Sequence, residues 1–182
     1  MKRIALLPVG DFDRRLAQRL CAPLAAAFVA ECRVLPQALD PQSAFHPERE
    51  QYHSTELLAA MHPLLASDGW RLLGLASVDL YIPVLTFVFG EAEMHGPCAV
   101  VGTHRLRQEC YGLPPAPELL YERTLKEAIH ELGHTVGLTH CDDYQCAMAA
   151  SHAAEWIDLK SASLCEHCRA EVAQNSAVSA GR

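Results

Sequence analysis

The chain has 182 residues, half of them apolar, and a formal net charge of −7 at pH 7. This length and composition allow one domain (1–182) with a sizeable core and are short for two. The negative charge and the lack of a basic run argue against nucleic acid or an anionic membrane as the main partner. No segment has the roughly 18 consecutive apolar residues that a transmembrane helix needs. The short apolar run at the N-terminus argues against secretion, so we expect a cytoplasmic protein.

The first two thirds of the chain alternate short apolar runs with helical patterns. Strands are predicted over residues 3–9, 32–35, 72–76, 85–89 and 99–103. Helices are predicted from Phe12, with a kink or restart at Pro23, and over 54–65. The run 99–103 could be a sheet edge that pairs with an extended peptide, or an ordinary interior strand. This order predicts an α+β (mixed α/β) fold.

A longer helix is predicted over 119–136. One apolar stripe runs along it, made of Leu125, Ile129, Leu132 and Val136. Two histidines lie on a different face, so we expect the stripe to pack on the sheet and the histidines to face a cleft.

The histidines belong to the segment His130-Glu-Leu-Gly-His134-Thr-Val-Gly137-Leu-Thr-His140. Residues four apart share a helix face, so His130 and His134 can bind one metal ion beside Glu131. His140 reaches the same ion only if the chain leaves the helix, and Gly137 suits such an exit. Three imidazoles around zinc leave one position for water, and Glu131 can then act as general base.

Four of the eight cysteines follow this motif in pairs, as Cys141-x4-Cys146 and Cys165-x2-Cys168. Paired cysteines at such short spacing favour a four-cysteine zinc site, with a disulfide or unliganded thiols as the alternatives. The other four, which we expect to be small buried hydrophobic residues, are Cys21, Cys32, Cys98 and Cys110.

The histidine motif, the four cysteines and Met148 together resemble the archaemetzincins, a metzincin-type family of zinc-dependent peptidases. The resemblance implies a twisted mixed sheet with an active-site helix and two zinc ions, one catalytic and one structural. It implies that His130, His134 and His140 bind the first zinc, that Glu131 is the base and that Met148 forms the Met-turn. The structural zinc would be bound by Cys141, Cys146, Cys165 and Cys168.

The structural zinc would stabilise a C-terminal lobe (138–172) that has few large apolar side chains, with Trp156, Ile157 and Leu159 as its main anchors. The N-terminal lobe (1–137) would hold the sheet and the active-site helix. Residues 173–182 are small and polar and are predicted to form a flexible tail.

The predicted function is hydrolysis of peptide bonds in a peptide or protein substrate by a monomeric enzyme. Tyr144 and His152 could supply an oxyanion donor, although both are more typical of solvent-facing loop residues. One alternative is a zinc-stabilised interaction module with a weak or vestigial hydrolase site. Another is a zinc hydrolase that acts on non-peptide amides.

Overall fold

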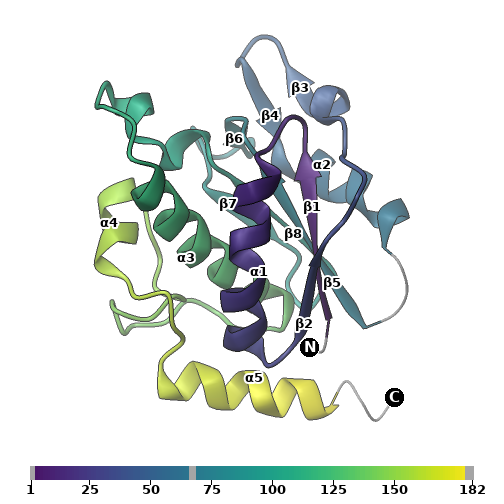
Figure 1. The fold of residues 1–182 in the computed structure, drawn as a ribbon, viewed down its shortest axis with the longest axis vertical. Coiled ribbons are helices and arrows are strands. Elements are labelled where there is room, and N and C mark those ends of the chain that lie inside the picture. Colours follow the sequence, from purple (N-terminus) through teal and green to yellow (C-terminus); the bar gives the residue numbers. More distant parts are fainter. Residues whose placement is uncertain (1–2, 66–68, 179–182) are drawn as a thin grey trace.

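A computed structural model describes residues 3–65 and 69–178 and arranges them around a five-stranded sheet (Figure 1). In spatial order its strands are β2 (Glu31–Val34), β1 (Arg3–Val9), β5 (Trp70–Ala76), β8 (Cys98–Gly102) and β7 (Gly90–Ala92). The first four strands are parallel, and β7 at the edge runs antiparallel to β8. A smaller sheet has the order β3 (Phe45–His46), β4 (Gln51–His53) and β6 (Leu80–Tyr81).

The helices cover both faces of the larger sheet. They are α1 (Arg14–Phe28), α2 (Ser54–Met61), α3 (Pro117–Thr135), α4 (Ala154–Leu159) and α5 (Glu166–Val178). Asp13 caps α1 by accepting a hydrogen bond from the backbone N–H of Arg15 at 2.8 Å. The helix then continues through Pro23 without the restart that the sequence suggested. Mixed sheets covered by helices confirm the predicted α+β class.

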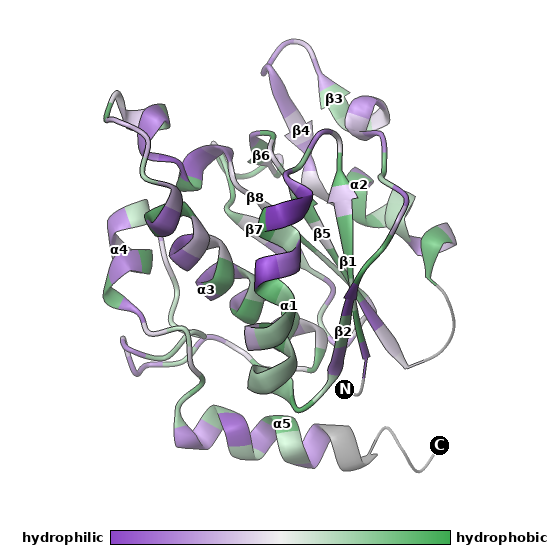
Figure 2. Cartoon of the chain, in the orientation of Figure 1, coloured by the Kyte–Doolittle hydropathy of each residue, from purple (hydrophilic) through white to green (hydrophobic). Residues whose placement is uncertain are grey.

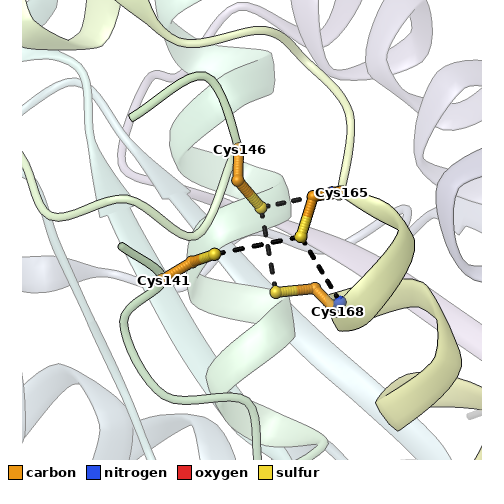
Figure 3. Close-up of side chains that lie close together, drawn as sticks. All are labelled: Cys141, Cys146, Cys165 and Cys168. Atoms are coloured by element: carbon orange, nitrogen blue, oxygen red, sulfur yellow. Dashed lines mark hydrogen bonds between the residues drawn. The ribbon is translucent and has the colours of Figure 1, made fainter. Parts of the chain in front are cut away.

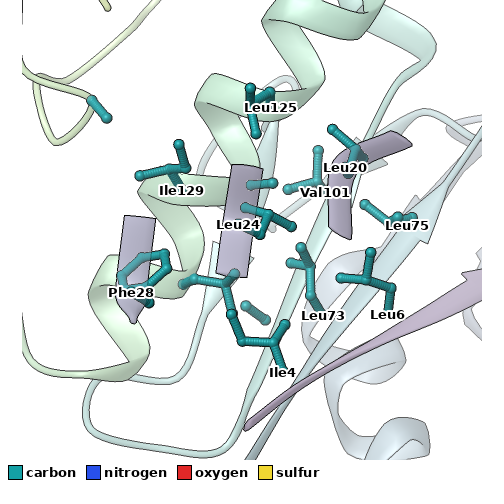
Figure 4. Close-up of a cluster of buried hydrophobic side chains, with 14 of the residues drawn as sticks. Ile4, Leu6, Leu20, Leu24, Phe28, Leu73, Leu75, Val101, Leu125 and Ile129 are labelled. Atoms are coloured by element: carbon teal, nitrogen blue, oxygen red, sulfur yellow. The ribbon is translucent and has the colours of Figure 1, made fainter. Parts of the chain in front are cut away.

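One core lies between the sheet and the pair α1 and α3, which stand side by side in front of it (Figures 1 and 4). Leu24 of α1 and Ile129 of α3 meet Leu73 and Val101 of the central strands. All four residues of the predicted α3 stripe are buried, which confirms the orientation of this helix. A second core, against α2, covers the other face of the sheet.

The hydropathy of the strands follows their place in the sheet. Figure 2 shows β1 as mostly hydrophobic, whereas β2, at one edge, alternates charged and apolar residues. Parallel strands buried on both faces read as continuous apolar runs, and β1 fits that rule. In the part of the chain that the structure describes, no helix is both long and apolar enough to cross a lipid bilayer.

The predicted strand at 85–89 is wrong. This segment is a loop in which Val88 forms a bridge with Leu80 and the Phe89 carbonyl accepts from the backbone N–H of Gly102 at 2.8 Å, and the strand begins later, at Gly90. Arg49 explains the difference, because its guanidinium donates to the carbonyls of Leu85 at 3.1 Å and Thr86 at 3.0 Å. Carbonyls bound by a distant side chain are not free to pair with a neighbouring strand.

The run 99–103 is an interior strand, not a sheet edge. It forms most of β8, which pairs with β5 on one side and β7 on the other. The edge beside the active-site helix is β7. The edge strand that could pair with an extended peptide is therefore Gly90–Ala92 and not 99–103.

The C-terminal segment differs from the prediction in two respects. The supposed tail is helical up to Val178, since α5 extends through it and Asn175 donates to the carbonyl of Val136 at 2.9 Å. Residues 179–182 of the predicted tail lie outside the described residues. Of the three predicted anchors Ile157 is buried, whereas Trp156 and Leu159 are 51% and 66% exposed.

Candidate active site

His130 and His134 lie one turn apart on α3 and are oriented by backbone carbonyls. Nδ1 of His130 lies 2.9 Å from the Ala147 oxygen, and Nδ1 of His134 lies 2.7 Å from the Leu138 oxygen. A carbonyl oxygen only accepts, so each Nδ1 carries the ring's proton. Each Nε2 is therefore unprotonated and has a lone pair that can bind a metal ion. Histidine ligands in metal sites commonly donate their other N–H to a backbone carbonyl in this way.

The two Nε2 atoms face each other at 3.1 Å. Nitrogens bound tetrahedrally to one zinc ion would stand about 3.3 Å apart. Burial lowers the pKa of His130 to about 3, helped by the charge of Lys160, and burial also lowers the pKa of His134. Both rings are thus held neutral, the form that binds metal.

The end of α3 returns the chain to the histidine pair. Gly137 adopts φ +92°, and its N–H donates to the carbonyl of His134 at 2.9 Å. Leu138 N donates to the carbonyl of Gly133 at 3.0 Å, so the helix ends in a tight turn. This turn brings the His140 ring to 5.2 and 5.1 Å from the rings of His130 and His134, between centroids. The ligand atoms of all three histidines lie within 4.8 Å of one another.

Glu131 is buried between α3 and the edge strand. A Cβ at Gly90 would lie 2.6 Å from Glu131 Oε1, so only glycine at this position leaves room for the carboxylate. Burial raises the pKa of Glu131 well above its usual value; Glu127 and Glu91 raise it further, and Lys160 opposes the rise. A raised pKa is typical of a carboxylate that accepts a proton in catalysis. The role of Gly90 could not be predicted from the sequence, because it depends on a contact made only in the folded chain.

Met148 lies fully buried in the turn that follows the histidine motif. Its carbonyl accepts from the backbone N–H of Cys141 at 3.0 Å, which ties the turn to the residue after His140. The thioether is therefore held near the end of α3, where a Met-turn residue would be expected.

The four paired cysteines come together between this turn and the start of α5 (Figure 3). Sγ of Cys141 lies 3.8 Å from Sγ of Cys165, and Sγ of Cys146 lies 3.8 Å from Sγ of Cys168. Thiolates bound tetrahedrally to zinc at about 2.3 Å stand about 3.8 Å apart, whereas a disulfide needs about 2.05 Å. The geometry fits a zinc ion and not a disulfide.

The three histidines and Glu131 line a cleft of about 430 Å³. Its opposite wall is formed by Phe87, Phe89 and Gly90, from the loop before β7 and the start of that strand. His152 also lines the cleft and packs edge to face on Trp156, with centroids 5.3 Å apart. Tyr144 is 68% exposed, in keeping with a solvent-facing loop residue.

The four cysteines without zinc spacing do not share one environment. Cys98 is buried in β8, as expected, while Cys21 and Cys32 are half-buried and Cys110 is exposed. The expectation of a buried hydrophobic residue is therefore wrong for Cys110.

Comparison with known proteins supports the same family at the level of sequence. A family model described as peptidase family M54 matches residues 41–174. The archaemetzincin of Methanocaldococcus jannaschii is 40% identical over 166 residues, which cover 91% of this chain and 90% of that protein.

Solved structures of similar proteins have the same fold as this chain. The crystal structure of archaemetzincin from Methanopyrus kandleri covers 97% of this chain and 96% of its own, with a TM-score of 0.83 and 33% identity. That of a zinc-dependent peptidase from Methanocorpusculum labreanum covers 93% and 99%, with a TM-score of 0.84 and 27% identity. The expected resemblance is confirmed: this chain belongs to peptidase family M54, the archaemetzincins, and is a zinc metallopeptidase.

Proposed function

We propose that His130, His134 and His140 hold the catalytic zinc and that Glu131 is the general base. The observation that carries this proposal is the pair of Nε2 atoms 3.1 Å apart, each unprotonated because its Nδ1 donates to a carbonyl. Two lone pairs at this distance repel each other unless a cation lies between them. The chemistry that zinc supplies in such a site is Lewis-acid activation of a water molecule and of a carbonyl group.

Glu131 performs the proton transfers. Its carboxylate accepts a proton from the attacking water, whose oxygen forms a bond to the scissile carbonyl carbon. The bond from that carbon to the amide nitrogen then breaks, and Glu131 returns the proton to the departing nitrogen. Burial of Glu131 beside Gly90 keeps bulk water from competing for this proton.

The peptide substrate is proposed to lie along β7. Among the described residues, β7 ends the larger sheet and pairs with β8 on one side. An extended peptide can add to such an edge through backbone hydrogen bonds. Phe87 and Phe89 would then contact its side chains from the cleft wall.

A second zinc ion is proposed for Cys141, Cys146, Cys165 and Cys168. It would stabilise the C-terminal lobe (138–172), in which two of the three predicted apolar anchors, Trp156 and Leu159, are exposed, and it would tether His140 through the adjacent Cys141. Four cysteines that bind zinc and do not oxidise to disulfides favour a reducing compartment such as the cytoplasm. All the proposed ligands come from one chain, so a monomer suffices.

The Glu131→Gln variant tests the proposed base. It removes the proton acceptor and keeps the shape of the side chain, so both metal ions should stay bound. Cleavage of a mixed library of internally quenched peptides should fall by about 100- to 10,000-fold. Cleavage by Glu131→Gln at the wild-type rate would exclude this base, and no cleavage by the zinc-loaded wild type would favour the interaction module.

A further inference from the structure

A buried lysine lies behind the histidine pair and has no part in the proton transfers. The Lys160 side chain is 1% exposed, and Nζ donates to Glu127 Oε1 at 2.9 Å, to the Ala149 oxygen at 3.0 Å and to the Ala147 oxygen at 3.3 Å. All three N–H groups of the ammonium thus have acceptors. A charge buried so deeply is costly unless it is fully paired, which points to a specific role.

One of these acceptors is shared with the active site. The Ala147 oxygen also accepts from Nδ1 of His130, at 2.9 Å. Lys160 and His130 therefore donate hydrogen bonds to the same carbonyl oxygen. The direction of this carbonyl decides how the His130 ring is turned, and hence where its Nε2 points.

The other two acceptors fix the same turn to the active-site helix. Ala147 and Ala149 flank Met148, so Lys160 holds the turn on both sides of the methionine. Glu127 lies on α3 one turn before Glu131 and anchors the ammonium to that helix. The contacts of Lys160 thus join the Met148 turn to the helix that carries His130.

We propose that Lys160 is a positioning residue for the catalytic metal centre: it holds the Ala147 carbonyl so that His130 presents Nε2 to the metal. The inference rests on the proposed function of the three histidines. It goes beyond the ligand set, because Lys160 is not among the residues that line the cleft and acts through a carbonyl.

A neighbouring ion pair supplies a matched control. Arg123 of α3 binds Asp158 of α4 through two hydrogen bonds of 2.7 and 2.6 Å. This pair attaches the same C-terminal segment to the same helix. The remaining hydrogen bond of the guanidinium goes to the carbonyl of Leu106 at 3.0 Å, far in sequence from the Met148 turn. The pair thus shares the anchoring role of Lys160 without its contact to the Ala147 carbonyl.

The test uses the full chain and measures Co²⁺ affinity by absorption titration, in which thiolate charge transfer distinguishes the cysteine site from the histidine site. Lys160→Met alone would leave Glu127 buried and unpaired, so the main variant is Lys160→Met combined with Glu127→Met. Such apolar replacement of both partners often preserves folding. The controls are Asp158→Asn, and Glu127→Gln, which keeps Lys160 on both carbonyls.

The double variant should bind Co²⁺ at the histidine site about 10- to 100-fold more weakly than the wild type, with an unchanged cysteine site. Both controls should bind Co²⁺ at the histidine site with an affinity within about threefold of the wild type, which is a smaller change than the loss expected for the double variant. Wild-type affinity in the double variant would overturn the proposal, and so would an equal loss in either control. Absence of a histidine-site signal in the wild type would instead reject the proposed function.

Discussion

The thioether of Met148 occupies the space that a side chain at Gly133 would need. A Cβ on Gly133 would lie 2.3 Å from Met148 Sδ and 3.0 Å from its Cε. Gly133 lies on α3 between Glu131 and His134, so the methionine packs directly against the helix that carries the histidines. Because Met148 is fully buried, its side chain has little room to move away.

Gly133→Ala should therefore destabilise the protein despite the better helix propensity of alanine. Overpacking costs about 1–3 kcal/mol, against a gain in propensity of up to about 1 kcal/mol. In a Met148→Ala background the same change should be neutral or stabilising, because the clashing atoms are gone. Urea unfolding of the four proteins of this cycle measures the coupling, which should exceed about 1 kcal/mol. Additive effects would show that the two residues do not compete for space.

Gly137→Ala should lower the free energy of unfolding for two separate reasons. The backbone at φ +92° is strained for any other residue, at a cost of about 1–3 kcal/mol. A Cβ there would also lie 2.2 Å from Cε1 of the exposed His95 ring, which would have to move away. Gly112→Ala is the matched control, since Gly112 has φ +72° and a Cβ there would meet no described atom within 4 Å. Equal losses in urea unfolding would argue against the His95 contact.

Loss of one zinc-site cysteine should remove the structural metal. Cys165→Ser replaces a cysteine whose thiol pKa is lowered chiefly by the backbone N–H of Cys168. We expect elemental analysis to find at most one zinc per chain and the free energy of unfolding to fall by more than about 3 kcal/mol. Cys110→Ser, at an exposed position, should keep two zinc ions and wild-type stability. Two zinc ions in Cys165→Ser would contradict the four-cysteine site.

Arg49→Ala should weaken substrate binding more than turnover. Its guanidinium holds the carbonyls of Leu85 and Thr86, in the loop that forms the cleft wall. A looser wall should raise KM several-fold and leave kcat within about threefold. Arg14→Ala is the control, because Arg14 also donates to two backbone carbonyls, of Leu35 and Pro36, outside the cleft. An equal rise of KM in both variants would rule out a specific role for the loop.

The parts of the site that sequence could predict are those encoded by local spacing. The histidines and cysteines come together as their intervals require, because helix periodicity and one glycine turn determine most of the geometry. The loop at 85–89 could not be predicted, since Arg49, some 36 residues earlier, binds its carbonyls. Lys160 and Gly90 had no sequence signal, because each owes its role to a contact made only in the folded chain.

Anomalous diffraction from a crystal of the zinc-loaded protein, recorded at the zinc absorption edge, tests the central claim most directly. We predict two zinc peaks per chain. One should lie about 2 Å from nitrogens of His130, His134 and His140, and the other about 2.3 Å from the four sulfur atoms. A zinc ion bound by His130 and His134 while the His140 ring points elsewhere, or no peak at the histidines, would contradict the account.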